Sequence, residues 1–226
     1  MDEFIRLESL VGENALKKLK SSSVALFGLG GVGGYCAEAL VRSAIGRIDL
    51  IDCDRIDATN INRQILALNS TIGQYKTKVA KTRLLDINPE LIVNTYEVFF
   101  DSETSFQFDF SKYDYIIDAI DSIPGKIELI VKANKASTRI ISSMGSADKL
   151  NPSLFLVDDI YKTTTCPLAR VMRYELKKRN IKKLKVVYSK ETPITKKKAP
   201  LPSSAFCPGC AGLILASEVV KDIIKN

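Results

Sequence analysis

The sequence contains no histidine, and only 5 of its 226 residues are cysteine. Without histidine, the chain has no Ser–His or Cys–His nucleophile pair, no histidine ligand for a catalytic zinc and no ordinary general base at neutral pH. The chemistry that remains uses carboxylates, lysine, arginine, backbone amides and bound metal. Phosphate chemistry suits this set of groups, because its catalysis depends mainly on positioning and on charge stabilisation.

Long apolar runs are also missing. No run approaches the ~18 residues that a membrane span requires, so we expect no membrane association. The first six residues include two acidic residues and lack the apolar centre of a signal peptide. This composition predicts a cytoplasmic protein whose cysteines are mostly reduced. Hydrophobic residues make up 46% of the chain, enough for a full core.

A glycine-rich segment follows the first apolar run. Residues 24–27 are typical of a buried parallel strand, and residues 35–44 of a helix whose N-terminus favours an anion. Residues 48–51 are the next expected strand, and Asp52 ends it, where a dinucleotide-type fold places its ribose-binding acid. The glycines between strand and helix are Gly28, Gly30, Gly31 and Gly33. Without side chains, they let backbone N–H groups approach a phosphate. The alternative is that these glycines serve only a tight turn.

Strand and helix patterns alternate along the rest of the chain. The expected helices cover residues 12–20, 74–86, 126–136, 167–179 and 211–224, and the expected strands cover 91–99, 115–119, 139–142, 154–160 and 184–189. This order predicts an α/β fold with a doubly wound, mostly parallel sheet, and a Rossmann-like ATP-binding fold follows from the residues discussed next. We expect a single domain, with a nucleotide-binding core at 1–150 and a C-terminal αβ elaboration at 151–226. Residues 190–205 are rich in Pro, Lys, Ser and Thr and are expected to form a mobile loop.

Polar residues after the second strand distinguish an adenylating enzyme from a nicotinamide enzyme. They are Asp54, Asn60, Asn62, Arg63, Gln64 and Lys76. A nicotinamide enzyme needs no arginine and lysine aimed at a polyphosphate, whereas adenylation needs them because pyrophosphate leaves with growing negative charge. Asp121, followed by Ser122, lies just past the strand at 115–119 and is the candidate Mg²⁺ ligand.

Taken together, these motifs resemble a known family. Gly-x-Gly-Gly-x-Gly, Asp-x-Asp, Asn-x-x-Arg-Gln, Gly-x-x-Lys and Asp-Ser are similar to motifs of the ThiF/MoeB-like adenylating enzymes, which are related to ubiquitin activation. The resemblance implies that ATP and magnesium are bound by Gly31, Asp52, Asn60, Arg63, Lys76 and Asp121. It also implies a homodimer in which Arg6 reaches the phosphates held by the partner subunit. The alternative for Arg6 is a solvated surface charge.

The C-terminal third resembles one branch of that family, the tRNA threonylcarbamoyladenosine dehydratases, at residues 141–145, 159–163, 166–173 and 187–191. The resemblance implies ATP-dependent activation of a carboxylate on a modified tRNA nucleoside, followed by ring closure with net loss of water. It also suggests a sulfur-relay or cysteine desulfurase partner. One alternative is an adenylyltransferase for the C-terminal glycine of a sulfur-carrier protein. Another is an NAD-binding dehydrogenase or a non-catalytic nucleotide sensor, which the polar residues named above disfavour.

Positive charge is concentrated in residues 162–198, which contain 13 Lys or Arg and two acidic residues. The rest of the chain contains 20 basic and 24 acidic residues. On the expected helix, Leu168, Val171, Met172 and Leu176 line the inward face. The basic residues favour contact with tRNA phosphates, and they are Lys162, Arg170, Arg173, Lys177, Lys182 and Lys183, extended by the lysines at 196–198. The alternative is a solvated charged face.

Two cysteines form a single CxxC motif, Cys207-Pro-Gly-Cys210. A structural zinc site normally needs two such pairs or added histidines, so helix-start packing is the favoured interpretation, with zinc, redox chemistry or a low-pKa thiol as alternatives. The lack of a second pair also disfavours the sulfur-carrier activators. Cys36 and Cys53 are expected to be buried small residues. Cys166, before a proline, is either a packing residue or a catalytic thiol.

Overall fold

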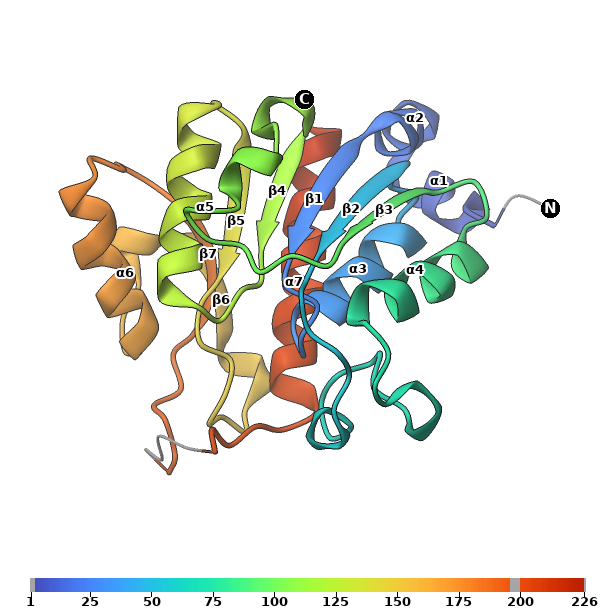
Figure 1. The fold of residues 1–226 in the computed structure, drawn as a ribbon. Coiled ribbons are helices and arrows are strands. Elements are labelled where there is room, and N and C mark those ends of the chain that lie inside the picture. The colour runs from blue at the N-terminus through green and yellow to red at the C-terminus, as the bar shows by residue number, and fades with distance from the viewer. Residues whose placement is uncertain (1–2, 196–199, 226) are drawn as a thin grey trace.

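The computed structural model describes residues 3–195 and 200–225, and its centre is one seven-stranded sheet with helices on both faces (Figure 1). The strand order is β3-β2-β1-β4-β5-β7-β6, and every neighbouring pair is parallel except β6 with β7. The strands are β1 (Ser23–Phe27), β2 (Arg47–Ile51), β3 (Ile92–Tyr96), β4 (Tyr115–Asp118), β5 (Arg139–Ser143), β6 (Phe155–Asp159) and β7 (Lys185–Ser189). The predicted doubly wound α/β fold is confirmed.

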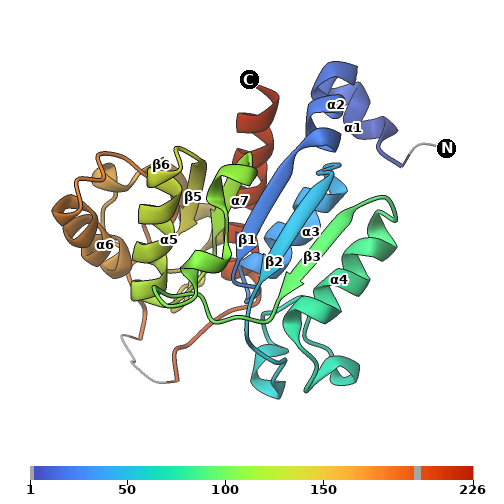
Figure 2. The same ribbon diagram turned by 45° about the horizontal axis from the view of Figure 1, so that its top comes forward.

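The helices divide between the two faces of the sheet (Figure 2). They are α1 (Ile5–Val11), α2 (Glu13–Ser21), α3 (Gly33–Arg42), α4 (Lys76–Ile87), α5 (Ile123–Lys135), α6 (Pro167–Lys178) and α7 (Phe206–Ile224). On one face α7 packs against α3 and α2, and on the other α5 packs against α6. Because both faces are covered, the central strands are mostly apolar, and all residues of β4 are buried, including Asp118.

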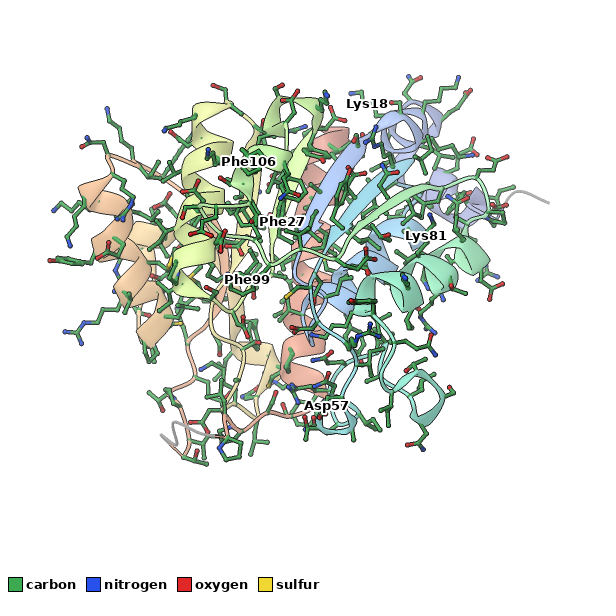
Figure 3. The ribbon with its side chains drawn as sticks, in the orientation of Figure 1. Lys18, Phe27, Asp57, Lys81, Phe99 and Phe106 are labelled. Atoms are coloured by element: carbon green, nitrogen blue, oxygen red, sulfur yellow. The ribbon has the colours of Figure 1, made fainter. Side chains whose placement is uncertain are left out.

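Aromatic rings fill the core beside α5. Phe27, at the end of β1, lies near the middle of the molecule (Figure 3). Its ring centroid is 4.8 Å from that of Phe100 and 5.5 Å from that of Phe108. These contacts tie the irregular segment between β3 and β4 to the sheet, and they place that segment beside the carboxyl end of β1.

Two helices differ most from the expectation. Residues 5–11 form α1, which the sequence analysis missed, and buried Phe4 anchors it against Leu16 and Ala44. The last helix begins at Phe206 rather than at residue 211. Its first turn contains Pro208, and proline is tolerated there because the first N–H groups of a helix have no intrahelical acceptor.

The segment 190–205 contains no helix or strand in its described parts, 190–195 and 200–205, and the lysines at 196–198 lie outside the described residues. Its predicted mobility stays a prediction. Among the helices that the structure describes, none has the length and apolar character needed to cross a membrane.

Candidate active site

A cavity of about 700 Å³ opens at the carboxyl edge of the sheet. It lies where β1 and β4 adjoin and the chain order of the strands reverses, which is where open α/β sheets bind ligands. The predicted site residues that line it are Gly28, Gly30, Gly31, Asp52, Asp54, Asn60, Arg63, Gln64, Lys76 and Asp121. The fold therefore brings together residues separated by more than 90 positions in the sequence.

The glycine loop is packed too closely for side chains at two positions. Gly28 has φ +92°, and a Cβ there would lie 2.6 Å from the carbonyl oxygen of Ala119. A Cβ at Gly33 would lie 1.8 Å from the carbonyl oxygen of Gly28, and Gly33 does not line the cavity. Gly33 thus allows the first turn of α3 to approach the loop, while Gly28, Gly30 and Gly31 form the cavity wall.

Asp52 braces this loop from the end of β2. Its Oδ2 accepts a hydrogen bond from the N–H of Leu29 at 2.6 Å, and its Oδ1 accepts one from the N–H of Asp54 at 2.8 Å. Burial raises the pKa of the Asp52 carboxyl, and the positive charge of Lys76 only partly opposes that rise. The carboxylate can still accept hydrogen bonds from ligand hydroxyl groups at the cavity wall.

Lys76, the first residue of α4, is a buried cation shared by two acids. Its Nζ lies 2.6 Å from Oδ2 of Asp54 and 3.8 Å from Oδ1 of Asp52. Burial alone would raise the pKa of Asp54, but the hydrogen bond and the charge from Lys76 outweigh burial and lower it. The two carboxylates therefore hold the ammonium group of Lys76 at the cavity wall, where it can approach a bound anion.

Arg63 lies across the glycine loop. Its Nη1 donates to the carbonyl oxygen of Thr59 at 2.8 Å and to Oδ1 of Asn62 at 2.9 Å. A Cβ on Gly31 would lie 3.5 Å from Cγ of Arg63. Asn62 does not line the cavity; its Nδ2 donates to the carbonyl oxygen of Ser203 at 3.1 Å. Asn62 thus orients the guanidinium from outside the cavity.

Gln64 carries an unsatisfied acceptor beside the loop. Its side chain lines the cavity and is buried, and its Oε1 has no hydrogen-bond partner among the described residues. A buried oxygen without a donor is costly, so a ligand or water that donates a hydrogen bond would stabilise this site. Together with the two cations and the glycine loop, it makes a cavity whose polar groups fit a nucleotide.

Asp121 is the Mg²⁺ ligand predicted from the sequence. This residue is exposed at the cavity wall, whereas Ser122 caps α5 by accepting a hydrogen bond from the N–H of Gly125 at 3.4 Å and does not line the cavity. The described residues include no group of three or more His, Cys, Asp or Glu placed to hold a metal. One carboxylate fits Mg²⁺ that takes its remaining ligands from phosphates and water.

Arg6 does not line the cavity of its own chain. It is exposed on α1, at the end of the molecule away from the glycine loop (Figure 1). The structure therefore does not bring Arg6 to the cavity of its own chain.

Several lining residues were missed by sequence analysis. They come from four loops and from the first turn of α7, and they are Arg55, Asp57, Val98, Phe99, Phe100, Ser146, Ala147, Leu201, Ser203 and Pro208. Asp57 and Phe99 mark two sides of this region in Figure 3. Only the adjacent aromatics at 99–100 offered a signal, because the other residue types are common in loops.

A buried polar network beneath the cavity was also missed. Lys126 and Asp118 are almost fully buried, and Nζ of Lys126 donates to Oδ1 of Asp118 at 2.9 Å. Oγ of Ser142 donates to Oδ2 of the same aspartate at 2.5 Å, and the N–H of Ile120 donates to Oδ1 at 3.1 Å. The network thereby fixes the path of the chain between β4 and Asp121.

The cysteines form no disulfide and differ in burial. All five are free, and burial raises the pKa of both Cys207 and Cys210, which disfavours the low-pKa alternative. Pro208 between them packs on the glycine loop, 3.0 Å from a Cβ built on Gly31. Cys36 and Cys166 are buried, whereas Cys53 is half-buried at the cavity wall, contrary to expectation.

The basic residues of the C-terminal third are placed differently from one another. Lys162, Arg170, Lys177, Lys182 and Lys183 are exposed. Arg173 is half-buried, and its Nη1 donates to the carbonyl oxygen of Thr163 at 3.0 Å and to the hydroxyl of the same residue.

The inward face of α6 also differs from the expectation in one position. Val171 is 42% exposed rather than inward-facing. The buried residues of this helix are Ala169, Met172 and Leu176.

Comparison with known proteins identifies the family. The ThiF family profile matches residues 4–226, almost the whole chain. The chain belongs to the ThiF family. The predicted family membership is therefore confirmed, and each of the motifs named from the sequence contributes at least one residue to the cavity wall.

Within the ThiF family, the chain is similar to proteins of one name. It is 44% identical to the tRNA threonylcarbamoyladenosine dehydratase of Bacillus subtilis over 244 aligned residues, covering 100% of this chain and 96% of that protein. The Escherichia coli protein of that name is 38% identical over 74% of this chain and 63% of its own length. Its solved structure in complex with ATP matches 99% of this chain and 94% of that chain, with a TM-score of 0.93 and 32% identity.

A sulfur-carrier enzyme is a more distant ThiF relative. The sulfur carrier protein adenylyltransferase of Thermus thermophilus is 34% identical, but over only 50% of this chain and 42% of its own length. The similarity to the dehydratases includes the C-terminal third, which is the part that distinguishes the two expected branches.

Proposed function

We propose that this chain is an ATP-dependent tRNA threonylcarbamoyladenosine dehydratase. The substrate carboxylate attacks the α-phosphorus of ATP, pyrophosphate leaves, and an acyl-adenylate forms. A nucleophile within the same modified nucleoside then displaces AMP and closes a ring, so that the nucleoside loses one water overall. The observation that carries this proposal is the whole-length similarity to the Bacillus subtilis enzyme, combined with a cavity whose polar groups fit a nucleotide.

Each part of the cavity has a task in this reaction. The amides of the glycine loop face the phosphates, and Asp52 accepts hydrogen bonds from the ribose. Arg63 and Lys76 stabilise the charge that grows on pyrophosphate as it leaves. Because the nucleophile of the first step is already ionised, no general base is needed, which agrees with the lack of histidine.

Mg²⁺ and a partner subunit belong to the same proposal. Asp121 would hold Mg²⁺, which supplies charge neutralisation at the phosphates when it is bound. Arg6 would enter the cavity of the partner in a homodimer, since its own cavity is out of reach. We further propose that the enzyme is cytoplasmic. The phosphates of the substrate tRNA would contact its exposed basic residues, which are Lys162, Arg170, Lys177, Lys182 and Lys183.

The test is turnover with defined substrates. Purified protein, ATP and Mg²⁺ are mixed with tRNA that carries threonylcarbamoyladenosine or with the same tRNA carrying plain adenosine. AMP should form only with the modified tRNA, and mass spectrometry of its nucleosides should show a product lighter by one water. If AMP formed with a sulfur-carrier protein ending in glycine but not with the modified tRNA, the dehydratase proposal would be wrong and the adenylyltransferase would replace it.

A further inference from the structure

The outer face of α6 combines an exposed aromatic ring with positive charge. Tyr174 is 63% exposed and Val171 is 42% exposed. The helical period places Arg170, Lys177 and Lys178 on the same strip as Tyr174, and all three are exposed. The opposite side of the helix is buried in the core, so this strip is the surface that α6 presents to a partner.

One face of the Tyr174 ring already has a neighbour. The Nζ of Lys178 lies 4.0 Å from the ring centroid, in the geometry of a cation–π contact. Glu175, whose Oε1 is 3.3 Å from the same ammonium, helps to hold Lys178 in place. A ring that is held from one side and remains 63% exposed offers its other side to a second flat group.

The strip begins beside the candidate active site. A Cβ on Gly145 would lie 3.8 Å from Sγ of Cys166, the residue that caps α6, and the adjacent Ser146 lines the cavity. A helix rises 1.5 Å per residue, so Tyr174 lies about 12 Å along the axis from Cys166. That distance corresponds to roughly three or four nucleotides stacked at 3.4 Å each.

We propose that Tyr174 is a stacking platform for an unpaired base of the substrate RNA, a few nucleotides from the nucleoside in the cavity. The inference rests on the proposed function for the identity of the RNA. Unpaired bases are commonly bound on aromatic rings, and the flanking cations Arg170, Lys177 and Lys178 match the charge of the RNA backbone. The surface fits RNA better than an acidic protein, because an RNA base can stack on the exposed ring while the RNA backbone contacts the flanking cations.

The experiment measures binding before catalysis. A fluorescent RNA stem–loop without the modification is titrated with wild type and with Y174A, Y174F, K177A and F106A, at several salt concentrations. A fully paired RNA duplex is the second ligand. Phe106 is the matched control, because it is 79% exposed on a 3₁₀ turn, Ser105–Gln107, distant from α6 in the sequence (Figure 3).

We expect Y174A to weaken stem–loop binding by about fivefold or more while leaving the salt dependence unchanged, because stacking releases no counterions. Y174F should bind like wild type, since it keeps the ring. K177A should instead reduce the slope of log K against log salt by about one. The duplex should bind wild type and Y174A equally, and F106A should match wild type with both ligands.

Catalysis gives an independent readout. With the modified stem–loop, Y174A should raise the KM for RNA by a similar factor while the KM for ATP and kcat stay near wild type. Unchanged stem–loop binding by Y174A, equal losses in Y174A and Y174F, or equal losses for the duplex would each overturn the stacking proposal. Absence of turnover by wild type would instead contradict the proposed function, and the binding series would still decide the role of Tyr174.

Discussion

At the scale of single residues, the two cations of the cavity are held in different ways. Lys76 is buried between two carboxylates, whereas Arg63 is half-buried and is anchored by a backbone carbonyl and by the amide of Asn62. Arg63 therefore keeps donors free for an anion, because only its Nη1 is used in the hydrogen bonds described. This difference makes Arg63 the better target for separating catalysis from folding.

Arg63→Ala should lower kcat for AMP formation by about 100-fold or more, because one preorganised donor at developing charge is typically worth that much. Stability should change little, since Arg63 is not part of the core. The measurement is AMP release at saturating substrates. Arg42→Ala is the control, because Arg42 makes an exposed pair with Glu38 at the far end of α3. Unchanged turnover in Arg63→Ala would remove this residue from the mechanism.

Lys126→Met should destabilise the protein by about 3–5 kcal/mol, because it leaves the carboxylate of Asp118 buried without its cation. Urea denaturation measures the free energy of unfolding. Lys17→Met is the control, since Lys17 forms an exposed pair with Glu13 on α2 and should have no measurable effect. A loss below about 1 kcal/mol for Lys126→Met would show that the Asp118 carboxylate is stabilised without the lysine.

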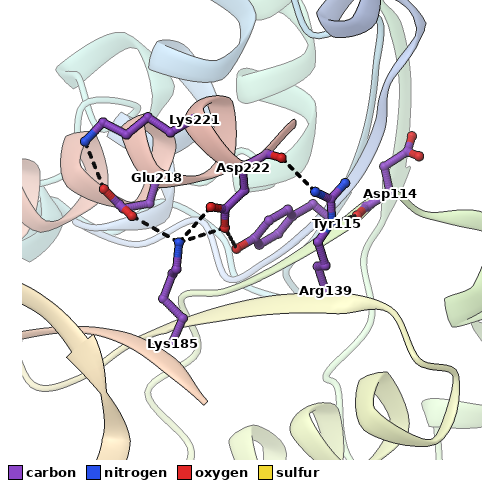
Figure 4. Close-up of polar contacts among 7 residues, drawn as sticks. All are labelled: Asp114, Tyr115, Arg139, Lys185, Glu218, Lys221 and Asp222. Atoms are coloured by element: carbon purple, nitrogen blue, oxygen red, sulfur yellow. Dashed lines mark hydrogen bonds and ion pairs between the residues drawn. The ribbon is translucent and has the colours of Figure 1, made fainter. Parts of the chain in front are cut away.

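At the scale of elements, both ends of α7 are held by contacts with the rest of the fold. Its first turn packs on the glycine loop through Pro208. Near its last turn, Asp222 accepts hydrogen bonds from Nζ of Lys185 at 2.8 Å and from the hydroxyl of Tyr115 at 2.7 Å (Figure 4). Arg139 donates to the backbone carbonyl of Asp222 at 2.8 Å. The position of α7 against the cavity thus depends on contacts at the opposite edge of the sheet.

Asp222→Asn should lower the free energy of unfolding by about 1–2 kcal/mol at neutral pH, allowing for partial solvent screening. Burial raises the pKa of Asp222, but the hydrogen bonds from Lys185 and Tyr115 outweigh it and lower the pKa below 3.8. A carboxyl with a lowered folded-state pKa stabilises the fold above pH 3.8, and this contribution is lost as the pH falls through the folded pKa.

The difference in stability between wild type and Asp222→Asn should therefore shrink below about pH 4. Unfolding curves from pH 3 to 7 measure it, with Glu90→Gln, an exposed carboxylate in the turn after α4, as the control. A difference that stayed constant across this range would show that Asp222 acts through packing rather than through its charge.

Most elements could be predicted from the sequence, because apolar runs and helical periods reflect local backbone geometry and burial. The strands β1 and β2 differ from their predicted ranges by one residue. Val171 shows the limit of this reasoning. Its helical position suggested an inward face, but the buried positions of α6 are Ala169, Met172 and Leu176, and Val171 is 42% exposed.

At the scale of the whole molecule, α1 and the cavity lie at opposite edges of the sheet. If Arg6 acts in the partner subunit, mixed dimers of Arg6→Ala and Arg63→Ala should contain one complete site each. Random mixing of the two inactive variants should then restore about a quarter of wild-type activity. AMP release after mixing under exchange conditions measures this. No recovery, with dimer exchange verified by mass, would contradict a role for Arg6 in trans.

The sequence by itself determined the α/β fold, the glycine loop, the acid at the end of β2 and the family, because these depend on short segments whose spacing sets their geometry. The tertiary structure alone decided which loops close the cavity. Ser146, Ser203 and Pro208 line the cavity with the glycine loop, and Pro208 packs against Gly31 of that loop. Such contacts follow no period in the chain, because long-range packing rather than local backbone geometry selects them.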